Sequence, residues 1–555
     1  MAKLDELKNG GAGSEVLSYI DAFGRAGPGS FSPDSAQTLR AYGIYSQRPT
    51  EPAFDETVFG EGHFFMVRIR IPGGRLTSTQ LSAIADVADL YGRGLADITV
   101  RQNIQLHWVT PGSLSDVVSR LIAVGLYTTE TCGDTVRNIV NCPVSGVDES
   151  ELYDTTELIR QVNDFFVGNS EFSDLPRKLK ITISGCALRC VYPEINDVGI
   201  FAVRDLERGG VAFRARVGGG LSTSPRFAQD LGVMVEPDQV VGLCAAIASV
   251  FRDEGDREDR SRGRLKFLVE QWDVPRFRAE VEQRLGLVLR RAPSPQAPPI
   301  EERDRSHLGI HRQHTPGLYY VGLSVLGGRT SGDELRALAA LATRYGSGRI
   351  RTTNTQNVIL LDVDGKNLGS LTQELDAAGF VYKPNWAEKA VIACTGIQFC
   401  KLAVAETKNR AAELSAFLAK ELELEEPIRI SVTGCPNSCG QHHICDVGLE
   451  GSVTTVDGAR QEAFQVILGG GVGVRETIGR RIGVRIPSDD VADALVRLLS
   501  RYKELKVGQE TFQQFCLRWS DEALAGFLTP GGKISAGEAS GLGLPLYKLV
   551  SRRSL

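Results

Sequence analysis

Apolar residues recur in the same pattern twice along the chain. Each copy reads as an apolar strand, a glycine turn, a helix with apolar residues three and four apart, and a second strand. The matched segments are HFFMVRIRIPGGRL (63–76) with LYYVGLSVLGGRT (318–330), 78–92 with 332–346, and 97–106 with 351–360. Such self-similarity predicts an internal duplication.

A second pair of segments follows these units. LKITISGCALRCVYPEINDVGI (179–200) matches IRISVTGCPNSCGQHHICDVGL (428–449), and each begins with a strand pattern that ends at Gly-Cys. We call the first repeated unit A and the second B, and mark their later copies A′ and B′. The chain is therefore expected to follow the order A, B, A′, B′. The Pro-rich, charged stretch at 290–305 is the predicted linker between the halves.

The composition is that of an ordinary globular protein and narrows the function classes. The 555 residues suffice for two to four domains, with 42% hydrophobic and 24% charged residues. A net charge of -5 argues against nucleic acid as a partner. No apolar stretch is long enough to span a membrane, and the first residues lack the apolar core of a signal peptide. We therefore expect a cytoplasmic protein whose eleven cysteines act as ligands or as buried side chains.

Four cysteines in the second half have the spacing of metal ligands. Cys394 and Cys400 form a C-x5-C pair, and Cys435 and Cys439 form a C-x3-C pair in the loop GCPNSCG. Four thiolates from two glycine-containing loops suit a [4Fe–4S] cluster, and exposed amides there can donate to sulfur. Structural zinc fits C-x5-C less well. On spacing alone, zinc and the absence of any metal remain open alternatives.

The first half keeps only part of this pattern. It has Cys142, Cys186 and Cys190, with Asp148 near the position of the missing fourth cysteine. Because three cysteines are usually too few, a relic of the duplication is favoured over a second cluster.

Basic residues are concentrated in the strand-like runs of the first half. Arg68 and Arg70 alternate along one strand and are expected on one face, where the repeat has Gly322 and Ser324. The other basic residues of this kind are Arg101, Arg137, Lys178 and Lys180. Cations that converge on one cavity would bind an anion and supply protons to it. The alternative is ordinary solvated charge, which is also what we expect of the loop histidines His442 and His443.

Taken together, these motifs resemble the assimilatory sulfite and nitrite reductases that couple siroheme to a [4Fe–4S] cluster. The resemblance runs from LRAYGIYSQR (39–48) to about residue 500 and includes RQNIQLH, PRKLK and GCPNSCG. It implies that Cys394, Cys400, Cys435 and Cys439 hold the cluster and that Cys439 also bridges to the siroheme iron. It places four substrate-binding cations around the open face of that iron: Arg68, Arg137, Lys178 and Lys180. The siroheme contacts that it implies are Arg101, Gln105, His107, Arg177, Gln356, Asn437 and Cys439.

The resemblance also implies a fold and a partner. The expected fold is α/β (α+β), with a pseudo-two-fold repeat of ferredoxin-like half-domains and two reductase-type α/β domains around a siroheme. The expected domains are an N-terminal segment with the first half-domain (1–135), the first α/β domain (136–289), the linker (290–305), the second half-domain (306–386) and the cluster-bearing α/β domain (387–555). The chain has no room for a flavin or nicotinamide domain, so electrons must come from ferredoxin or from a separate flavoprotein.

The choice of substrate depends on one lysine. Reduction of sulfite to sulfide and of nitrite to ammonia each takes six electrons, so the cofactors do not discriminate. Lys-x-Lys, which is KLK at 178–180, is typical of the family's sulfite reductases, whereas plant-type nitrite reductases have Asn at the second lysine. Lys180 therefore favours sulfite, the larger dianion, with nitrite as the alternative. A corrin-pathway monooxygenase relative and a non-catalytic iron–sulfur or zinc protein are further alternatives.

Overall fold

The computed structural model describes residues 12–26, 33–47, 64–293, 306–389 and 391–531. It contains two compact units, each described by itself: unit 1 is Met1–Gly220 with Arg226–Lys383, and unit 2 is Leu221–Pro225 with Pro384–Leu555. Most of the predicted linker, residues 294–305, lies outside the described residues. No helix in the described ranges has the length and apolar character of a membrane span.

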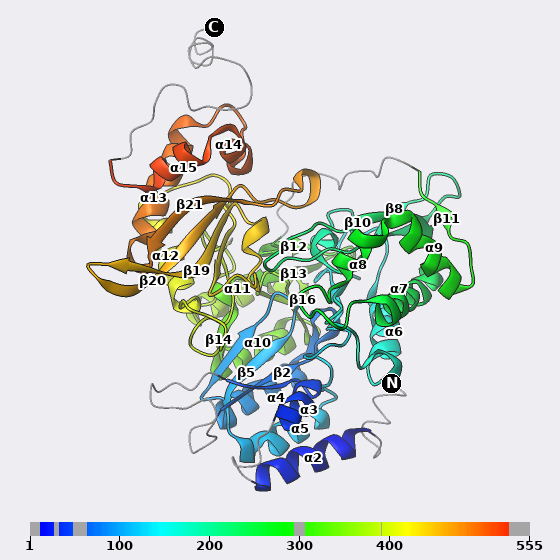
Figure 1. Ribbon diagram of the computed structural model, residues 1–555. Coiled ribbons are helices and arrows are strands. Elements are labelled where there is room, and N and C mark those ends of the chain that lie inside the picture. Colours follow the sequence, from blue (N-terminus) through cyan, green and yellow to red (C-terminus); the bar gives the residue numbers. More distant parts are fainter. Residues whose placement is uncertain (1–11, 27–32, 48–63, 294–305, 390, 532–555) are drawn as a thin grey trace. The chain divides into compact units, whose positions relative to one another are not determined.

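Unit 1 contains two five-stranded sheets that exchange one strand with each other (Figure 1). The first sheet has the order β1 (Ile44–Ser46), β2 (Phe65–Ile69), β5 (Ile104–Val109), β4 (Leu95–Ile98) and β14 (Arg329–Ser331). The second has the order β12 (Gly309–Arg312), β13 (Leu318–Leu323), β16 (Val358–Asp364), β15 (Arg349–Thr352) and β3 (Arg75–Thr77). Strand β3 of the first copy therefore completes the sheet of the second copy, and β14 does the reverse.

Two glycines make this exchange sterically feasible. Gly74 has φ +70°, and a Cβ there would lie 2.2 Å from the carbonyl oxygen of Thr352 in the other copy. Gly328, its counterpart, has φ +75°, and its Cβ would lie 2.4 Å from the oxygen of Ile98. Any larger residue would clash with backbone at either position. The glycine turns in the repeated pattern thus mark the points where the copies cross.

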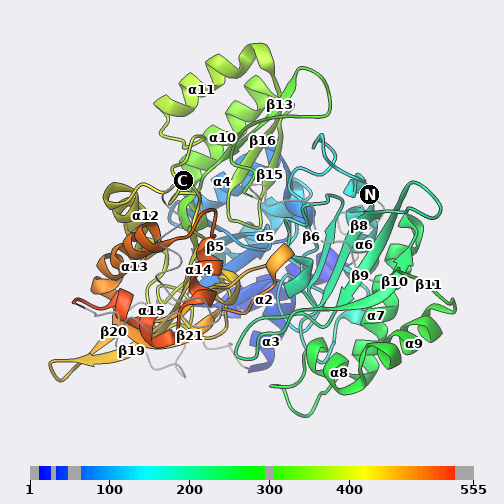
Figure 2. The ribbon, with the colours of Figure 1, turned by 90° about the horizontal axis from the view of Figure 1, so that it is seen from above.

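Each exchanged strand runs directly into a helix. Helix α4 (Ser78–Tyr91) begins with a capping box between Thr77 and Gln80, and α10 (Gly332–Tyr345) begins with one between Ser331 and Glu334. The two helices pack against each other (Figure 2), and both copies share one apolar core. The remaining helices of this pair of half-domains are α2 (Ala12–Ala26), α3 (Pro33–Ala41), α5 (Leu114–Ala123) and α11 (Leu368–Ala377).

A third sheet of unit 1 carries the first B segment. Its order is β11 (Arg290–Arg291), β10 (Gln229–Val235), β9 (Val211–Val217), β8 (Val198–Arg204), β7 (Ile181–Ser184) and β6 (Val140–Asn141). Strands β6, β7 and β8 are parallel, and the strands from β8 to β11 pair antiparallel. One core joins the sheet to helices α6 (Thr156–Phe166), α7 (Val240–Glu254), α8 (Leu265–Trp272) and α9 (Val274–Leu285).

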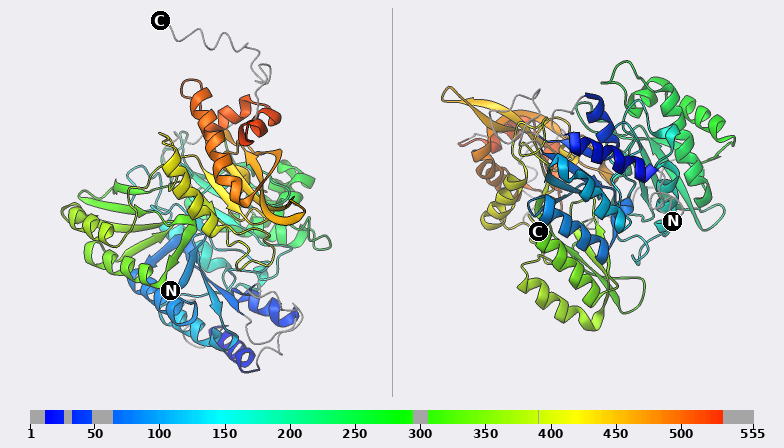
Figure 3. Two further views of the ribbon diagram at one scale, coloured as in Figure 1. Left: turned by 90° about the vertical axis from the view of Figure 1, so that its left-hand side faces the viewer. Right: turned by 90° about the horizontal axis from the view of Figure 1, so that it is seen from below.

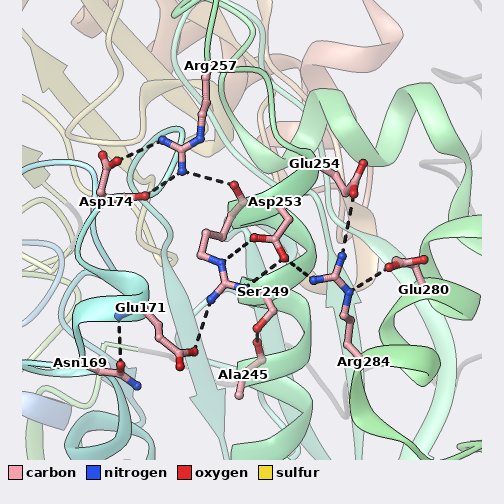
Figure 4. Close-up of polar contacts among 11 residues, drawn as sticks. Asn169, Glu171, Asp174, Ala245, Ser249, Asp253, Glu254, Arg257, Glu280 and Arg284 are labelled. Atoms are coloured by element: carbon pink, nitrogen blue, oxygen red, sulfur yellow. Dashed lines mark hydrogen bonds and ion pairs between the residues drawn. The ribbon is translucent and has the colours of Figure 1, made fainter.

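Charged side chains connect α7 and α9 on their polar sides (Figure 4). Asp253 accepts hydrogen bonds from Arg252 and Arg284, and Arg284 also donates to Glu280. These groups are partly exposed, so the network adds little stability in water.

Unit 2 repeats the third sheet. Its order is β17 (Val391–Ala393), β18 (Ile430–Thr433), β19 (Val447–Val456), β20 (Ala459–Leu468) and β21 (Arg480–Pro487), parallel from β17 to β19 and antiparallel afterwards. Helices α12 (Lys408–Glu421) and α13 (Val491–Leu505) pack on it (Figure 3), and α14 (Phe512–Arg518) and α15 (Asp521–Leu528) extend the same core. The predicted order A, B, A′, B′ is confirmed.

Candidate active site

Two arginines of unit 1 contact one backbone carbonyl. Arg68 in β2 donates from Nη1 to the oxygen of Thr131 at 3.2 Å and to Cys132 Sγ at 3.3 Å. Arg137 donates from Nη1 to the same Thr131 oxygen at 2.9 Å. Its Nε and Nη2 donate to the oxygen of Gly133 at 3.1 and 2.6 Å. The two predicted substrate cations therefore lie side by side on the same short segment.

Arg70, the second arginine of the β2 pattern, is a positioning residue. It is fully buried and donates to Asn163 Oδ1 at 3.0 Å. It also donates to the carbonyl oxygens of Glu130, Val136 and Arg137 at 3.1, 3.2 and 3.4 Å. Burial lowers the pKa of its guanidinium. Arg70 thus anchors the segment that carries Arg137 to helix α6.

Arg101 lies in a buried, positively charged region. Its guanidinium donates to Asn196 Oδ1 at 2.9 Å and to the oxygens of Asn138 and Ile181 at 2.5 and 3.1 Å. Its Nε is buried and has no hydrogen-bond partner among the described residues. Burial, followed by repulsion from Arg137, lowers the pKa of Arg101 to about 9. A further acceptor at this guanidinium would satisfy the buried N–H group.

Lys178 and Lys180 precede strand β7 rather than lying within it. Burial lowers the pKa of Lys180 well below its usual value, and Lys178, Arg264 and Arg101 lower it further. Asp197 is the opposing charge, but Arg264 already binds it, through Nε at 3.1 Å and Nη2 at 2.8 Å. Net positive charge therefore remains around Lys180, and an anion bound there would raise its pKa again.

The ion pair between Arg264 and Asp197 was not predicted, although the sequence contains a signal for the aspartate. Asp197 lies in INDVG and its counterpart Asp446 lies in ICDVG. Each accepts the backbone N–H of the residue immediately before an earlier strand, Lys180 before β7 and Arg429 before β18. Arg264 is the last residue of the charged run DREDRSRGR (256–264), in which no local pattern distinguishes it from the other arginines.

Two further predicted contacts, Gln105 and His107, lie at alternate positions of β5. The amide oxygen of Gln105 accepts from Arg68 Nη2 and Nε at 2.5 and 3.0 Å, so Gln105 orients that guanidinium. His107 is buried, with Nδ1 2.9 Å from Gln47 Nε2 and Nε2 3.1 Å from Asp97 Oδ2. Both ring nitrogens of His107 therefore already have partners.

Arg177 and Gln356, also predicted contacts, occur in different surroundings. Arg177 is partly exposed and pairs with Asp134 at 3.0 Å. Gln356 has φ +66° and donates from Nε2 to the oxygen of Ile98 at 2.9 Å. Gln356 thus supports the crossing of the two copies in unit 1.

The four cysteines of unit 2 lie in loops that follow adjacent parallel strands. Cys394 comes directly after β17 and Cys435 comes two residues after the end of β18, with Cys400 and Cys439 further along each loop. Cys435 is buried and Cys439 is exposed. The pKa of Cys394 is raised to about 12, first by burial and then by the neighbouring sulfur of Cys439. Cys394 and Cys439, which come from different loops, are therefore near enough to interact electrostatically.

Amide groups donate to these sulfurs, as the glycine and asparagine content predicts. The N–H of Gly434 donates to Cys394 Sγ at 3.3 Å. Burial raises the pKa of Cys435 to about 11, and hydrogen bonds from the backbone and side chain of Asn437 oppose the rise. Such donors stabilise thiolates, which are the form that binds metal. This donor set fits an iron–sulfur cluster.

The loop that follows Cys435 also presents buried polar atoms. Ser438 Oγ and Gln441 Oε1 are buried and have no hydrogen-bond partner among the described residues. Both residues have positive φ, 54° and 69°. Unsatisfied polar atoms and a constrained backbone beside Cys439 are typical of a loop that holds a bound group.

His442 and His443 are buried, so the expectation of solvated loop histidines was wrong. His442 Nδ1 lies 2.5 Å from Thr433 Oγ1, and its Nε2 lies 3.1 Å from Glu450 Oε2. Burial opposes the ionisation of Glu450, but hydrogen bonds from His442 and from Arg481, the latter at 2.7 Å, lower the pKa of Glu450 to about 2. Burial also lowers the pKa of His442. Burial and His442 together lower the pKa of His443 to about 4.

Comparison with known proteins identifies the same architecture. Residues 132–289 and 388–520 match the family described as "Nitrite and sulphite reductase 4Fe-4S domain". Residues 60–124 and 311–378 match the "Nitrite/Sulfite reductase ferredoxin-like half domain". The predicted fold, with its pair of half-domains and its pair of α/β domains, is confirmed.

Individual relatives carry two kinds of name. The chain is 36% identical over 539 residues to "Sulfite reductase [ferredoxin]" of Mycobacterium tuberculosis strain H37Rv, covering 94% of this chain and 95% of that protein. It is 38% identical over 505 residues to "Ferredoxin--nitrite reductase" of Leptolyngbya laminosa, covering 90% and 96%. The solved structure of the Mycobacterium tuberculosis NirA protein matches with a TM-score of 0.87 and 36% identity, covering 94% of this chain and 96% of that one.

Proposed function

Because the chain belongs to the nitrite and sulfite reductase family, an oxidoreductase family with a [4Fe–4S] domain, we propose that it reduces sulfite to sulfide with electrons from ferredoxin. The relatives' names support both a sulfite and a nitrite substrate at similar identity. The positive charge around Lys180 is the observation that favours sulfite over nitrite as the substrate. Sulfite is a dianion at alkaline pH and nitrite is a monoanion, so the second lysine contributes more to sulfite binding.

We assign the cluster to Cys394, Cys400, Cys435 and Cys439. The amide donors to Cys394 and Cys435 support this assignment. The exposure of Cys439 supports its second role, as the ligand shared with siroheme. When bound, the cluster and siroheme would pass the six electrons from ferredoxin to the substrate. The thiols must release their protons to bind iron, because burial holds the pKa values of Cys394 and Cys435 above neutrality.

We assign substrate binding to Arg68, Arg137, Lys178 and Lys180. The two arginines are fixed by backbone carbonyls, so they can neutralise an anion with little reorganisation. Lys180 holds a proton at Nζ whose release is made easier by burial and by the surrounding cations, which lower its pKa. That property suits a group that supplies protons as oxygen atoms leave as water.

The siroheme contacts form a second part of the proposal. The carboxylates of a siroheme would provide the acceptor that the buried Nε of Arg101 requires. The other proposed contacts are Gln105, His107, Arg177, Gln356 and Asn437. Within this set, Gln105 and His107 would act by orienting Arg68 and β5, since their side chains are already hydrogen-bonded.

The test compares kcat/KM for sulfite and for nitrite, using reduced ferredoxin and holoenzyme produced with a siroheme supply. We expect a preference for sulfite, and Lys180→Asn should lower kcat/KM for sulfite roughly tenfold more than for nitrite, because one charge acts on a dianion. Lys366→Asn, at an exposed position, is the matched control and should change neither value.

The outcomes separate the alternatives. A preference for nitrite would assign the chain to nitrite reduction, and an unchanged substrate ratio in Lys180→Asn would refute the role of Lys180 in selecting sulfite. A siroheme-loaded enzyme that reduces neither anion would refute the reductase function and favour the monooxygenase relative. Turnover with a flavoprotein but not with ferredoxin would refute the proposed donor.

A further inference from the structure

Unit 1 contains a group of three buried cysteines that the proposed reaction does not use. The Sγ atoms of Cys142, Cys186 and Cys190 all lie within 4.8 Å of one another, and those of Cys186 and Cys190 are 3.9 Å apart. We call this group the thiol triad. It lies in a small apolar core with Val140, Val144, Leu188 and Ile359 among its other members. The sequence analysis treated these cysteines as a relic of the duplication.

The triad occupies positions equivalent to those of the cluster ligands. Strand pairing aligns Asn141 with Ile183 in unit 1 and Ala393 with Val432 in unit 2, so Cys142 corresponds to Cys394. Cys186 and Cys190 correspond to Cys435 and Cys439 by the sequence repeat. Three of the four ligand positions of one repeat are therefore cysteines in the other.

The loop of the triad also keeps the backbone conformation of the cluster loop. Arg189 and Tyr192 have φ of 50° and 53°, and their counterparts Ser438 and Gln441 have φ of 54° and 69°. Non-glycine residues in this left-handed region each cost on the order of 1 kcal/mol or more. In addition, Asn354 donates to the oxygen of Cys190 at 2.9 Å and holds the turn. A loop that had lost all ligand function would have no reason to keep this strained conformation.

The missing fourth ligand argues against a second iron–sulfur cluster. The position equivalent to Cys400 is Asp148, whose Oδ1 accepts from the N–H and Oγ of Ser150 at 2.9 and 3.0 Å. Cysteines that bind different irons of a cubane are separated by an iron–iron distance in addition to two iron–sulfur bonds. The thiols of the triad are closer together than that arrangement allows.

The spacing does fit a single metal ion. With metal–sulfur bonds of ~2.3 Å, two thiolates on one ion are ~3.8 Å apart in tetrahedral geometry and ~4.0 Å apart in trigonal geometry. The 3.9 Å between Cys186 and Cys190 lies in this range. We propose that the thiol triad binds one thiophilic d10 ion, of the class of Zn²⁺ and Cu⁺, separately from the cluster of unit 2. Binding would release the three thiol protons to solvent, and the ion would link the ends of β6 and β7.

The test loads purified holoenzyme with one equivalent of Zn²⁺ or, under anaerobic reducing conditions, of Cu⁺. After removal of unbound metal, zinc, copper and iron are counted per chain by mass spectrometry. X-ray absorption at the zinc or copper edge then counts the sulfur ligands. We expect one ion per chain with three sulfurs at ~2.3 Å. These element-specific readouts are independent of the iron in unit 2 and of activity.

Variants and a control complete the design. Cys142→Ala and Cys186→Ala should each reduce bound zinc or copper at least tenfold. Cys244→Ala should keep full binding, because Cys244 is a buried thiol of α7 outside the triad. If either triad variant fails to fold, the X-ray absorption spectrum of the wild-type enzyme still shows whether three sulfurs bind the ion.

Retention of only zinc or only copper identifies the preferred ion, and either result supports the site. The proposal is overturned if wild-type enzyme retains neither ion, or if the triad variants retain as much as Cys244→Ala. It is also overturned if the triad variants lose iron instead, or if a metal-free Cys186–Cys190 disulfide is found.

Discussion

Replacement of Arg70 by methionine tests how unit 1 positions its substrate cations. Arg70 is fully buried and makes four hydrogen bonds, three of them to the carbonyls of Glu130, Val136 and Arg137. Each buried acceptor that loses its partner costs about 1–3 kcal/mol. Methionine avoids the cost of burying a charged guanidinium, and this offsets part of the loss. We expect a net loss of about 4 kcal/mol in the free energy of unfolding.

The assay is thermal unfolding of the holoenzyme beside sulfite kinetics. At about 2 °C per kcal/mol for a large unit, Arg70→Met should lower Tm by roughly 8 °C. It should also reduce kcat/KM beyond the loss of folded protein, because Arg137 is released from its anchor. Arg160→Met is the matched control, since Arg160 is an exposed residue of α6 in a surface ion pair worth at most about 1 kcal/mol.

Arg70→Lys adds a test of geometry. Lysine keeps the charge but cannot reach all four acceptors, so its Tm should lie between those of the wild type and Arg70→Met. The reasoning is refuted if Arg70→Met melts within about 2 °C of Arg160→Met. It is also refuted if the two Arg70 variants retain wild-type kcat/KM.

Three further predictions concern the cluster, proton supply and the surface. Cys439→Ser should abolish ferredoxin-driven sulfite reduction, whereas Cys516→Ala, at a buried thiol, should retain it; full activity of Cys439→Ser would contradict the ligand assignment. Because the pKa of Lys180 is lowered, kcat/KM for sulfite should fall with rising pH earlier than an ordinary lysine would allow, and Lys180→Asn should lack that limb of the profile. Asp253, whose pKa is lowered to about 2 chiefly by Arg252, stabilises the fold above the unfolded-state pKa of about 3.9, and this contribution disappears as pH falls through 2. Asp253→Asn should therefore cost under about 1 kcal/mol at neutral pH and nothing in strong acid, as measured by chemical denaturation.

The sequence predicted the elements and loops that depend on local pattern. Apolar periodicity and the recurring glycines located the repeated strands and helices, because those signals come from neighbouring residues. The four cysteines of unit 2 were proposed as ligands from their spacing in glycine-containing loops, and the two arginines on Thr131 were proposed from their charge within apolar runs; these roles stay predictions.

Features that depend on distant residues were not predictable in this way. The exchange of β3 and β14 is decided by backbone pairing between the copies, which no local pattern encodes. Lys178 and Lys180 were placed in a strand by their alternation, but β7 begins only at Ile181. The burial of His442 follows from Glu450 and Thr433 lying against it, and the role of Arg264 follows from Asp197, far from it in sequence.

The exchanged strands have a consequence for the origin of the fold. Each ferredoxin-like half of unit 1 lacks one edge of its own sheet and has that edge supplied by the other half. A single half would therefore be incomplete as a monomer, and two identical halves would complete each other as a symmetric dimer. The present gene has the architecture of such a dimer joined into one polypeptide. Joining allowed the two copies to diverge, so one half has Arg68 and Arg70 where the other has Gly322 and Ser324.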